Sequence, residues 1–148
     1  MDLITVDFET YYDKGFSLSK LTTEEYIRDP RFEIVGVGVK VNNNETEWAS
    51  GPKREIKRFL QIFDWGKAVF LAHNTMFDGA IANWVFGITP CVYTDTLCIA
   101  RAVNGVEAGA SLRALAEKHK LGVKGTEVSA ALGKRREDFT LEELSRYG

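Results

Sequence analysis

The stretch Ile4 to Thr10, ITVDFET, decides the fold, because it predicts a strand that is apolar on one face and acidic on the other. Side chains alternate across a strand, which sets Ile4, Val6 and Phe8 against Thr5, Asp7 and Glu9. Two carboxylates held this close beside an apolar core repel each other and are costly to desolvate. Two interpretations stay open. Asp7 and Glu9 form half of a site for a hard cation such as Mg²⁺ or Mn²⁺, whose ligands are oxygens, or they lie on the solvent face of an edge strand.

The composition limits the broad class of the protein. A chain of 148 residues with 45% hydrophobic residues fits one folded domain with a single core. The formal net charge is -2, with acidic and basic residues well mixed. This argues against a broad surface that follows a phosphate backbone through many Lys and Arg contacts. It does not exclude nucleic acid that is held at one end through metal ions.

Cysteine usage and hydropathy bear on the compartment. Cys91 and Cys98 form no CxxC pair, and we find no secretory leader. We therefore expect free thiols and a reducing, cytoplasmic location. No apolar run approaches the ~20 residues that a membrane helix needs, so we expect no membrane association.

The remaining sequence alternates between strand and helix patterns. A hairpin of strands is followed by alternating helices and strands, which predicts an α/β domain with a mixed central sheet flanked by helices. The expected strands are 3–8, 33–41, 45–49, 67–72 and 91–94. The expected helices are a short one after Thr22, one after Pro52, one with Phe77, Ile81, Trp84 and Val85 inward, and those at 97–103, 112–120 and from about 141. Residues suited to N-capping precede four of them: Thr22, Asp95, Ser111 and Thr140.

The second expected strand has valine on one face and glycine on the other. Valine at alternate positions from 35 to 41 predicts a buried face, while Gly36 and Gly38 share the opposite one. Glycine inside a strand often marks a close approach by another element. We expect this face to meet another backbone or a helix.

The second chemical stretch, HNTMFDG at 73–79, follows a predicted buried strand and opens a helix. Open α/β sheets place their sites at such junctions. Each residue also has a plain structural interpretation: Asn74 as a helix cap, Asp78 as a first-turn acid that favours the helix dipole, and His73 as a structural residue at a strand end. The combination of D-x-E on one strand with N-x-x-F-D after another favours a shared site over coincidence.

These motifs resemble those of a known superfamily. Asp7-Phe8-Glu9 resembles the first motif, and Asn74 through Asp78 the second, of the DEDD (DnaQ-like) 3′–5′ exonucleases, whose fold is RNase H-like. More narrowly, the stretches at 7–11 and 26–33 resemble the proofreading exonuclease domain of bacteriophage-type family A DNA polymerases, as do those at 95–97 and 111–116. The resemblance covers nearly the whole chain.

The resemblance implies a site and a reaction. Asp7, Glu9 and Asp78, with a fourth carboxylate, are expected to hold two Mg²⁺ or Mn²⁺ ions and to be the catalytic residues. Thr10, Asn74 and Phe77 are expected to contact the substrate, and for Phe77 a core position is the better expectation. The implied substrate is the 3′ end of single-stranded DNA, hydrolysed by two-metal catalysis.

The third motif of this superfamily, Tyr-x-x-x-Asp or His-x-x-x-x-Asp, has no complete match. The helix from about 141 reaches Tyr147, and no Asp follows. We therefore expect residues 1–148 to be one exonuclease-like domain that is incomplete at its C-terminus, and weak or inactive alone. The expected parent continues into a polymerase domain, in host cytoplasm if phage-encoded. Self-association is expected through apolar residues of the shortened helix, Leu141 and Leu144.

Three alternatives remain open. The first is a non-catalytic module that holds a nucleic-acid end in the same cleft. The second is an RNA-directed exonuclease on the same scaffold, because the sequence does not choose the sugar. The third is a purely structural α/β domain, which leaves the pairing of the two motifs unexplained.

Overall fold

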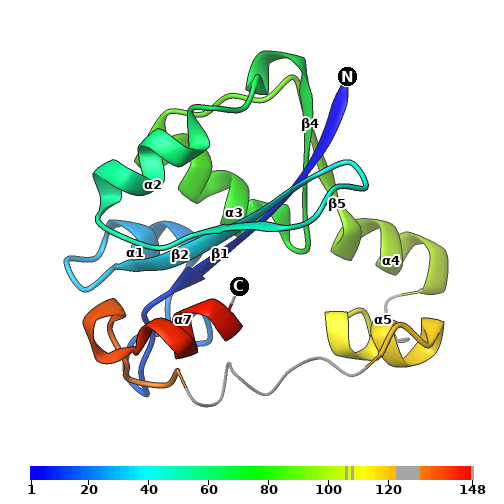
Figure 1. Cartoon of the computed structure of the whole chain (residues 1–148). Helices are drawn as coiled ribbons and strands as arrows, with labels where there is room; N and C mark the ends of the chain where they lie inside the picture. Colours follow the sequence, from blue (N-terminus) through cyan, green and yellow to red (C-terminus); the bar gives the residue numbers. More distant parts are fainter. Residues whose placement is uncertain (106, 108, 123–130, 148) are drawn as a thin grey trace.

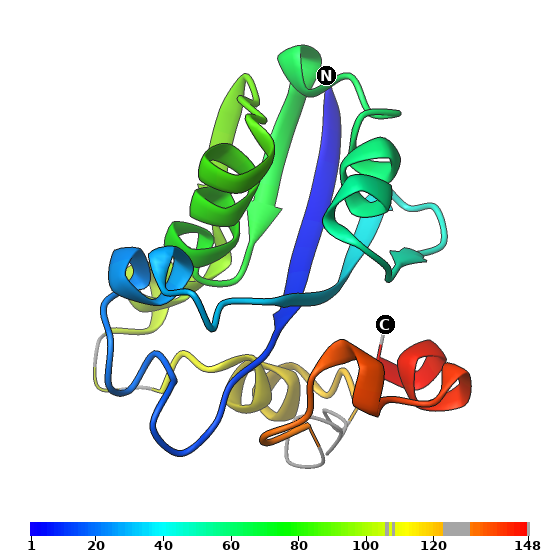
Figure 2. The same cartoon turned by 90° about the vertical axis from the view of Figure 1, so that its left-hand side faces the viewer.

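A mixed five-stranded sheet with the strand order β3-β2-β1-β4-β5 is the centre of the molecule (Figure 1). The computed structural model describes residues 1–105, 107, 109–122 and 131–147. Helices flank the sheet, and α5 and α7 lie at the end toward which β1 runs (Figure 2). The predicted α/β class with a mixed central sheet is confirmed.

The strand β1, Asp2–Thr10, is the central strand of the sheet. It pairs antiparallel with β2 from Ile4 opposite Val41 to Thr10 opposite Ile34. On its other side it pairs in parallel with β4, but only from Asp2 to Thr5. β1 is therefore not an edge strand of the sheet, although at Asp7 and Glu9 it pairs with β2 alone and Asp7 is exposed.

The other strands are β2, Ile34–Val41, β3, Glu47–Ala49, β4, Ala68–Ala72, and β5, Val92–Asp95. The valine face of β2 is buried, as predicted. The glycine face meets both a side chain and, as predicted, a backbone: a Cβ on Gly36 would lie 2.3 Å from the Trp48 ring and 3.0 Å from the Ala49 carbonyl oxygen. At Gly38 a Cβ would make only an ordinary contact, 3.7 Å from Thr46. Only Gly36 is therefore sterically required.

The helices follow the predicted order. They are α1 (Thr23–Arg28), α2 (Lys53–Leu60), α3 (Thr75–Ala80), α4 (Thr96–Asn104), α5 (Leu112–His119) and α7 (Leu141–Tyr147), with 3₁₀ turns at Trp65–Lys67 and Arg136–Asp138. All four predicted caps are confirmed, since the side chains of Thr22, Asp95, Ser111 and Thr140 accept backbone N–H bonds. Within the described residues, no helix has the length and apolar character to cross a membrane.

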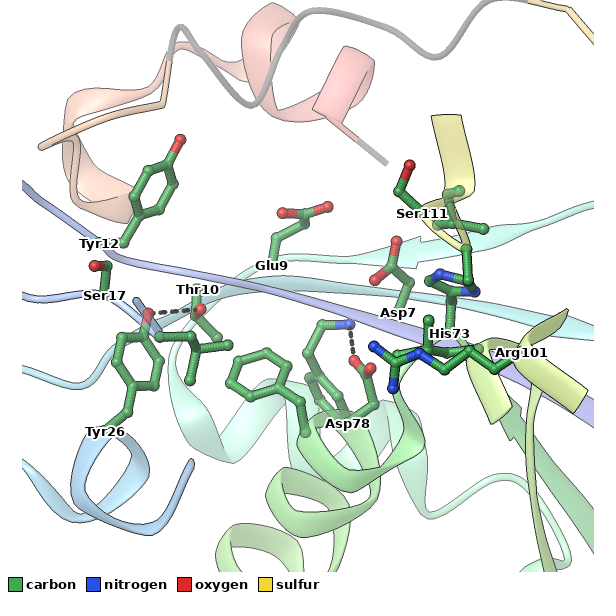
Figure 3. Close-up of a pocket in the computed structure, with 16 residues that line it drawn as sticks. Asp7, Glu9, Thr10, Tyr12, Ser17, Tyr26, His73, Asp78, Arg101 and Ser111 are labelled. Atoms are coloured by element: carbon green, nitrogen blue, oxygen red, sulfur yellow. Dashed lines mark hydrogen bonds between the residues drawn. The ribbon is translucent and has the colours of Figure 1, made fainter. Parts of the chain in front are cut away.

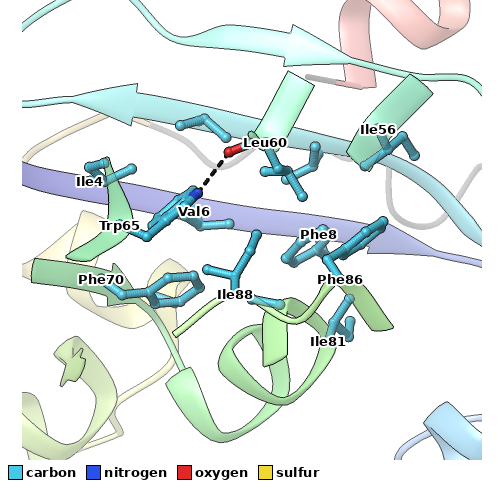
Figure 4. Packing of buried hydrophobic residues seen from close by; sticks show 14 of the residues in the cluster. Ile4, Val6, Phe8, Ile56, Leu60, Trp65, Phe70, Ile81, Phe86 and Ile88 are labelled. Carbon is cyan, nitrogen blue, oxygen red and sulfur yellow. Dashed lines mark hydrogen bonds between the residues drawn. The ribbon is translucent and has the colours of Figure 1, made fainter. Parts of the chain in front are cut away.

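The core lies between one face of the sheet and the helices α2 and α3 (Figure 4). The apolar face of β1 is buried in it, and the Phe8 ring stacks on Phe86 with centroids 5.9 Å apart. Trp65 closes one end of the core, where its Nε1 donates to the Leu60 carbonyl at 2.7 Å. The strand that carries the acidic pair is thus fixed by packing.

The prediction that Trp84 faces inward is wrong, because its side chain is 46% exposed. The helix α3 continues into a π-helix, η2, over Ile81–Val85. A π-turn contains more residues than an α-turn, so it rotates the following side chains away from the expected face. Ile81 stays buried, while the inward position further along is taken by Phe86.

Candidate active site

The candidate site lies where β1 and β4 separate. Pairing between these strands ends at Thr5, so the amide of Phe8 has no partner on β4. Asp78 from α3 occupies this place, and its Oδ1 accepts the Phe8 N–H at 2.9 Å (Figure 3). Phe8 stands between Asp7 and Glu9 in the sequence. The structure therefore brings the second motif onto the first, across 70 positions of chain.

A cleft of about 720 Å³ opens at this point, and all three acidic residues line it. Asp7 and Glu9 point into it from β1, and Asp78 enters from below in the view of Figure 3. The start of α5 forms part of the wall through Ser111 and Leu112. The cleft is thus built from segments that are far apart in the sequence.

Asp78 is the buried member of the acidic group, with 4% of its surface exposed. Burial raises the pKa of its carboxyl to about 8, and the charges of Asp7 and Glu9 add to this rise, while the Phe8 N–H opposes it. With a pKa near 8, the carboxyl keeps its proton at neutral pH unless positive charge is brought close. A cation in the cleft would supply that charge.

The chemistry of these side chains fits a hard divalent cation, because all three offer carboxylate oxygens. Their present arrangement is not a finished site. Across the part of the chain that the structure describes, no three His, Cys, Asp or Glu side chains are grouped closely enough to hold a metal ion. Asp7 is exposed and Glu9 partly so, and rotamer changes of exposed side chains are fast. Side-chain rotation at β1 is therefore one way to bring the carboxylates closer together.

Thr10 and Phe77, two of the predicted substrate contacts, line the cleft. The Thr10 hydroxyl lies 2.9 Å from the Tyr26 hydroxyl, which donates in turn to the Tyr11 carbonyl. The Phe77 ring packs 5.9 Å from Tyr26 and against the core cluster. Phe77 is therefore both a core residue, as expected, and part of the cleft wall.

Asn74, the third predicted contact, lies elsewhere. It stands at the N-cap of α3 in the left-handed region, with φ 73°, and its side chain makes no capping bond. Asn74 therefore has the predicted N-cap position but not the side-chain bond of a cap. Its N–H donates to the Asp95 carboxylate at 3.0 Å, and the residue lines a neighbouring groove instead of the acidic cleft. His73 does line the cleft, and its Nδ1 lies 2.9 Å from the Thr96 hydroxyl.

Some residues of the cleft were not singled out from the sequence as site residues. Tyr12 and Arg101 line it, and Arg101 reaches toward the acidic group from α4 (Figure 3). Arg101 belongs to a helix that the sequence pattern did predict, but nothing in that pattern indicates which neighbour its polar face meets.

Comparisons with known proteins add to this geometry. No protein-family model matches the chain, and a search of curated proteins found no match. Among solved structures it is similar to Brucella melitensis NrnC with bound Mg²⁺ (12% identity, TM-score 0.66) and bound to pGG (13%, 0.63). It is also similar to a structure described as the apo form of the nuclease (15%, 0.67).

Each alignment covers 97% of this chain and 63% of the other, so the chain spans less than two thirds of the length of these neighbours. At such low identity the likeness establishes the fold. The α/β fold of this chain is of the RNase H-like kind.

Proposed function

We propose that this chain is the nuclease part of a metal-dependent 3′–5′ exonuclease that hydrolyses single-stranded nucleic acid. Asp7, Glu9 and Asp78 are its catalytic residues and the ligands of its divalent cations. The observation that carries the proposal is the bond from the Phe8 N–H to Asp78, which brings the two motifs together at one cleft.

The structural neighbours support this proposal. One is described as the apo form of the nuclease, and two are structures of Brucella melitensis NrnC, one with bound Mg²⁺ and one bound to pGG. Because this chain covers only part of their length, their activity is an argument by likeness. It agrees with the acidic cleft, which has the oxygen ligands that Mg²⁺ or Mn²⁺ requires.

Each residue has a defined part in the proposed reaction. When bound, two divalent cations supply a water of lowered pKa and neutralise charge on the phosphate. Asp7, Glu9 and Asp78 would hold these cations through their carboxylate oxygens. The wall of Thr10 and Phe77 positions the terminal nucleotide. The fourth carboxylate and the Tyr or His of the third motif have no assigned residue in this chain.

We favour RNA over DNA as the substrate. One neighbour is described as bound to pGG, a name without the deoxy prefix of a DNA nucleotide, and this favours RNA. The proofreading domain of a phage-type DNA polymerase remains the second candidate, because the sequence resemblance favours it. That candidate alone requires a polymerase domain as its partner.

The test uses single-stranded RNA and DNA labelled at the 5′ end, with enzyme in excess so that weak turnover is seen. We expect stepwise shortening from the 3′ end in Mn²⁺ or Mg²⁺, faster for RNA, and none in EDTA. The variant Asp78→Asn should abolish it. The control is Asp64→Asn, an exposed aspartate whose ion pair with Lys67 lies outside the cleft.

The same samples separate the alternatives. A non-catalytic module would bind the labelled strands without shortening them and without taking up Mn²⁺. The proposed function is wrong if a longer form of the chain that supplies the third motif shortens neither strand in Mn²⁺, or if Asp78→Asn cleaves as fast as the unchanged chain.

A further inference from the structure

A second groove of about 620 Å³ adjoins the acidic cleft. It runs over α3, η2 and β5, and it shares the side chains of Leu97 and Arg101 with the cleft. The two hollows therefore meet at Arg101. A strand end held at the carboxylates would have to leave the cleft somewhere, and this junction is one exit.

The groove is lined by large exposed apolar side chains. Met76 is 69% exposed, Trp84 46% and Tyr93 44%. Exposed side chains of this size gathered in one groove mark a binding surface. The Tyr93 ring packs on two neighbours. It lies so close to Gly79 that an added Cβ there would be 3.1 Å from it, and its centroid is 5.5 Å from that of the Phe70 ring.

The charges around the groove favour an anionic ligand. The side chain of Arg101 makes no hydrogen bond, ion pair or ring contact with any other residue that the structure describes. Arg28, which is paired with Glu24 at 2.9 Å, lies over the Trp84 ring, 5.3 Å from its centroid, so a base that stacks on Trp84 uses the other face of the indole or displaces Arg28. The acid in the groove, Asp95, is the N-cap of α4, and its oxygens accept from the amides of Asn74 and Leu97 and from the Cys98 thiol.

We propose that the nucleic-acid strand continues from the acidic cleft past Arg101 into this groove. Arg101 binds a phosphate at the junction, and Trp84 and Tyr93 stack on the bases upstream of the 3′ end. Aromatic platforms combined with arginine are the usual means of holding single strands without sequence preference. This inference rests on the proposed function for the direction of the strand, while the binding itself needs no hydrolysis.

Trp84 provides the test, because a base that stacks on it should quench its fluorescence. The probes are single-stranded oligonucleotides of two and of eight nucleotides, titrated in EDTA so that no cleavage occurs. We expect the longer strand to quench Trp84 and the shorter one to leave it unchanged. Trp84→Leu should remove the quenching and weaken binding of the longer strand roughly tenfold.

Further variants sharpen the result. Arg101→Ala should weaken binding of both strands. It should also reduce the slope of log affinity against log salt concentration by about 1, the change expected for one phosphate contact. Tyr93→Phe, which keeps the ring, should retain binding, whereas Tyr93→Leu should weaken it with little change in Tm. Arg54→Ala, an exposed arginine on α2 outside both hollows, is the matched control and should bind normally.

Several outcomes would overturn the inference. One is unchanged affinity for the longer strand in Trp84→Leu and Tyr93→Leu. Another is that these two variants lose affinity equally for the longer and the shorter strand. A third is a Trp84 signal that depends on protein concentration but not on oligonucleotide, which would assign the groove to a second copy of this chain. Quenching without 3′ shortening in Mn²⁺, even by the longer form of the chain, would contradict the proposed nuclease function but support strand binding in the groove.

Discussion

The two halves of β1 differ in how their backbone amides on the β4 side find hydrogen-bond acceptors. At Ile4 and Thr5 the strand is paired with neighbours on both sides. Beyond that point β4 is no longer its partner, and the Phe8 amide is satisfied by the Asp78 carboxylate. The first solution uses neutral backbone groups and adds stability. The second keeps an acidic group in a nearly dry position, which costs stability and, in the proposed function, offers a carboxylate to a cation.

The largest expected effect is the dependence of stability on pH. Because the pKa of Asp78 is raised from 3.8 to about 8, the folded state binds more protons than the unfolded state between these values. The free energy of unfolding in EDTA should therefore fall as pH rises from about 4 to 8, by at most ~1.4 kcal/mol per pH unit from this group. Urea denaturation across this range measures the slope.

The variant Asp78→Asn isolates that contribution. Its amide oxygen can still accept the Phe8 N–H, but it carries no charge, so the slope between pH 4 and 8 should flatten. An unchanged slope would mean that Asp78 does not keep its proton in the folded chain. Asp78→Ala should instead lower stability by about 1–3 kcal/mol, because it leaves the Phe8 amide without its acceptor.

The second largest effect is expected from removal of the Phe8 ring, which lies on the buried face of β1 between Asp7 and Glu9. Phe8→Ala should lower the free energy of unfolding by about 3–5 kcal/mol, since the ring is 4% exposed and stacks on Phe86. Glu9→Gln, one position along on the other face, should change it by less than about 1 kcal/mol. Equal losses for the two variants would contradict the division of β1 into a structural and a chemical face.

A smaller effect is expected opposite Glu9, where Gly36 pairs with it across the sheet. Gly36→Ala should cost about 1–3 kcal/mol, because the new Cβ would meet the Trp48 ring at 2.3 Å. Gly38→Ala, with its nearest atom at 3.7 Å, is the control and should be nearly neutral. Thermal unfolding of both variants gives the comparison, and a neutral Gly36→Ala would show that the indole moves aside freely.

The smallest effect is expected at the cleft wall. Tyr26→Phe removes the hydroxyl that bonds to Thr10 and to the Tyr11 carbonyl, and should cost about 1 kcal/mol. The ring remains packed on Phe16, with centroids 4.4 Å apart. A loss well above that of Gly36→Ala would show that the hydroxyl network, rather than the ring, holds this wall.

Local sequence patterns predicted the features that depend on neighbouring residues, namely the strands and the helix starts. Alternation found the strands, and short polar residues such as Thr22 and Asp95 marked the helix starts, because a cap bonds to amides two or three residues away. The meeting of Asp78 with β1 was predicted only because two separate motifs occurred together. The rest depended on packing between distant segments. The π-turn exposed Trp84, the Trp48 ring covered Gly36, and Arg101 reached the cleft from a helix whose docking no periodicity encodes.

The central claim is that Asp7, Glu9 and Asp78 hold a divalent cation together. Titration of Mn²⁺ into the chain, followed by electron paramagnetic resonance of the free ion, tests it most directly, without any need for turnover. We predict that the unchanged chain and Asp64→Asn remove Mn²⁺ from solution with equal affinity, whereas Asp78→Asn does so at least tenfold more weakly. Binding by all three chains alike, or by none of them, would contradict the account.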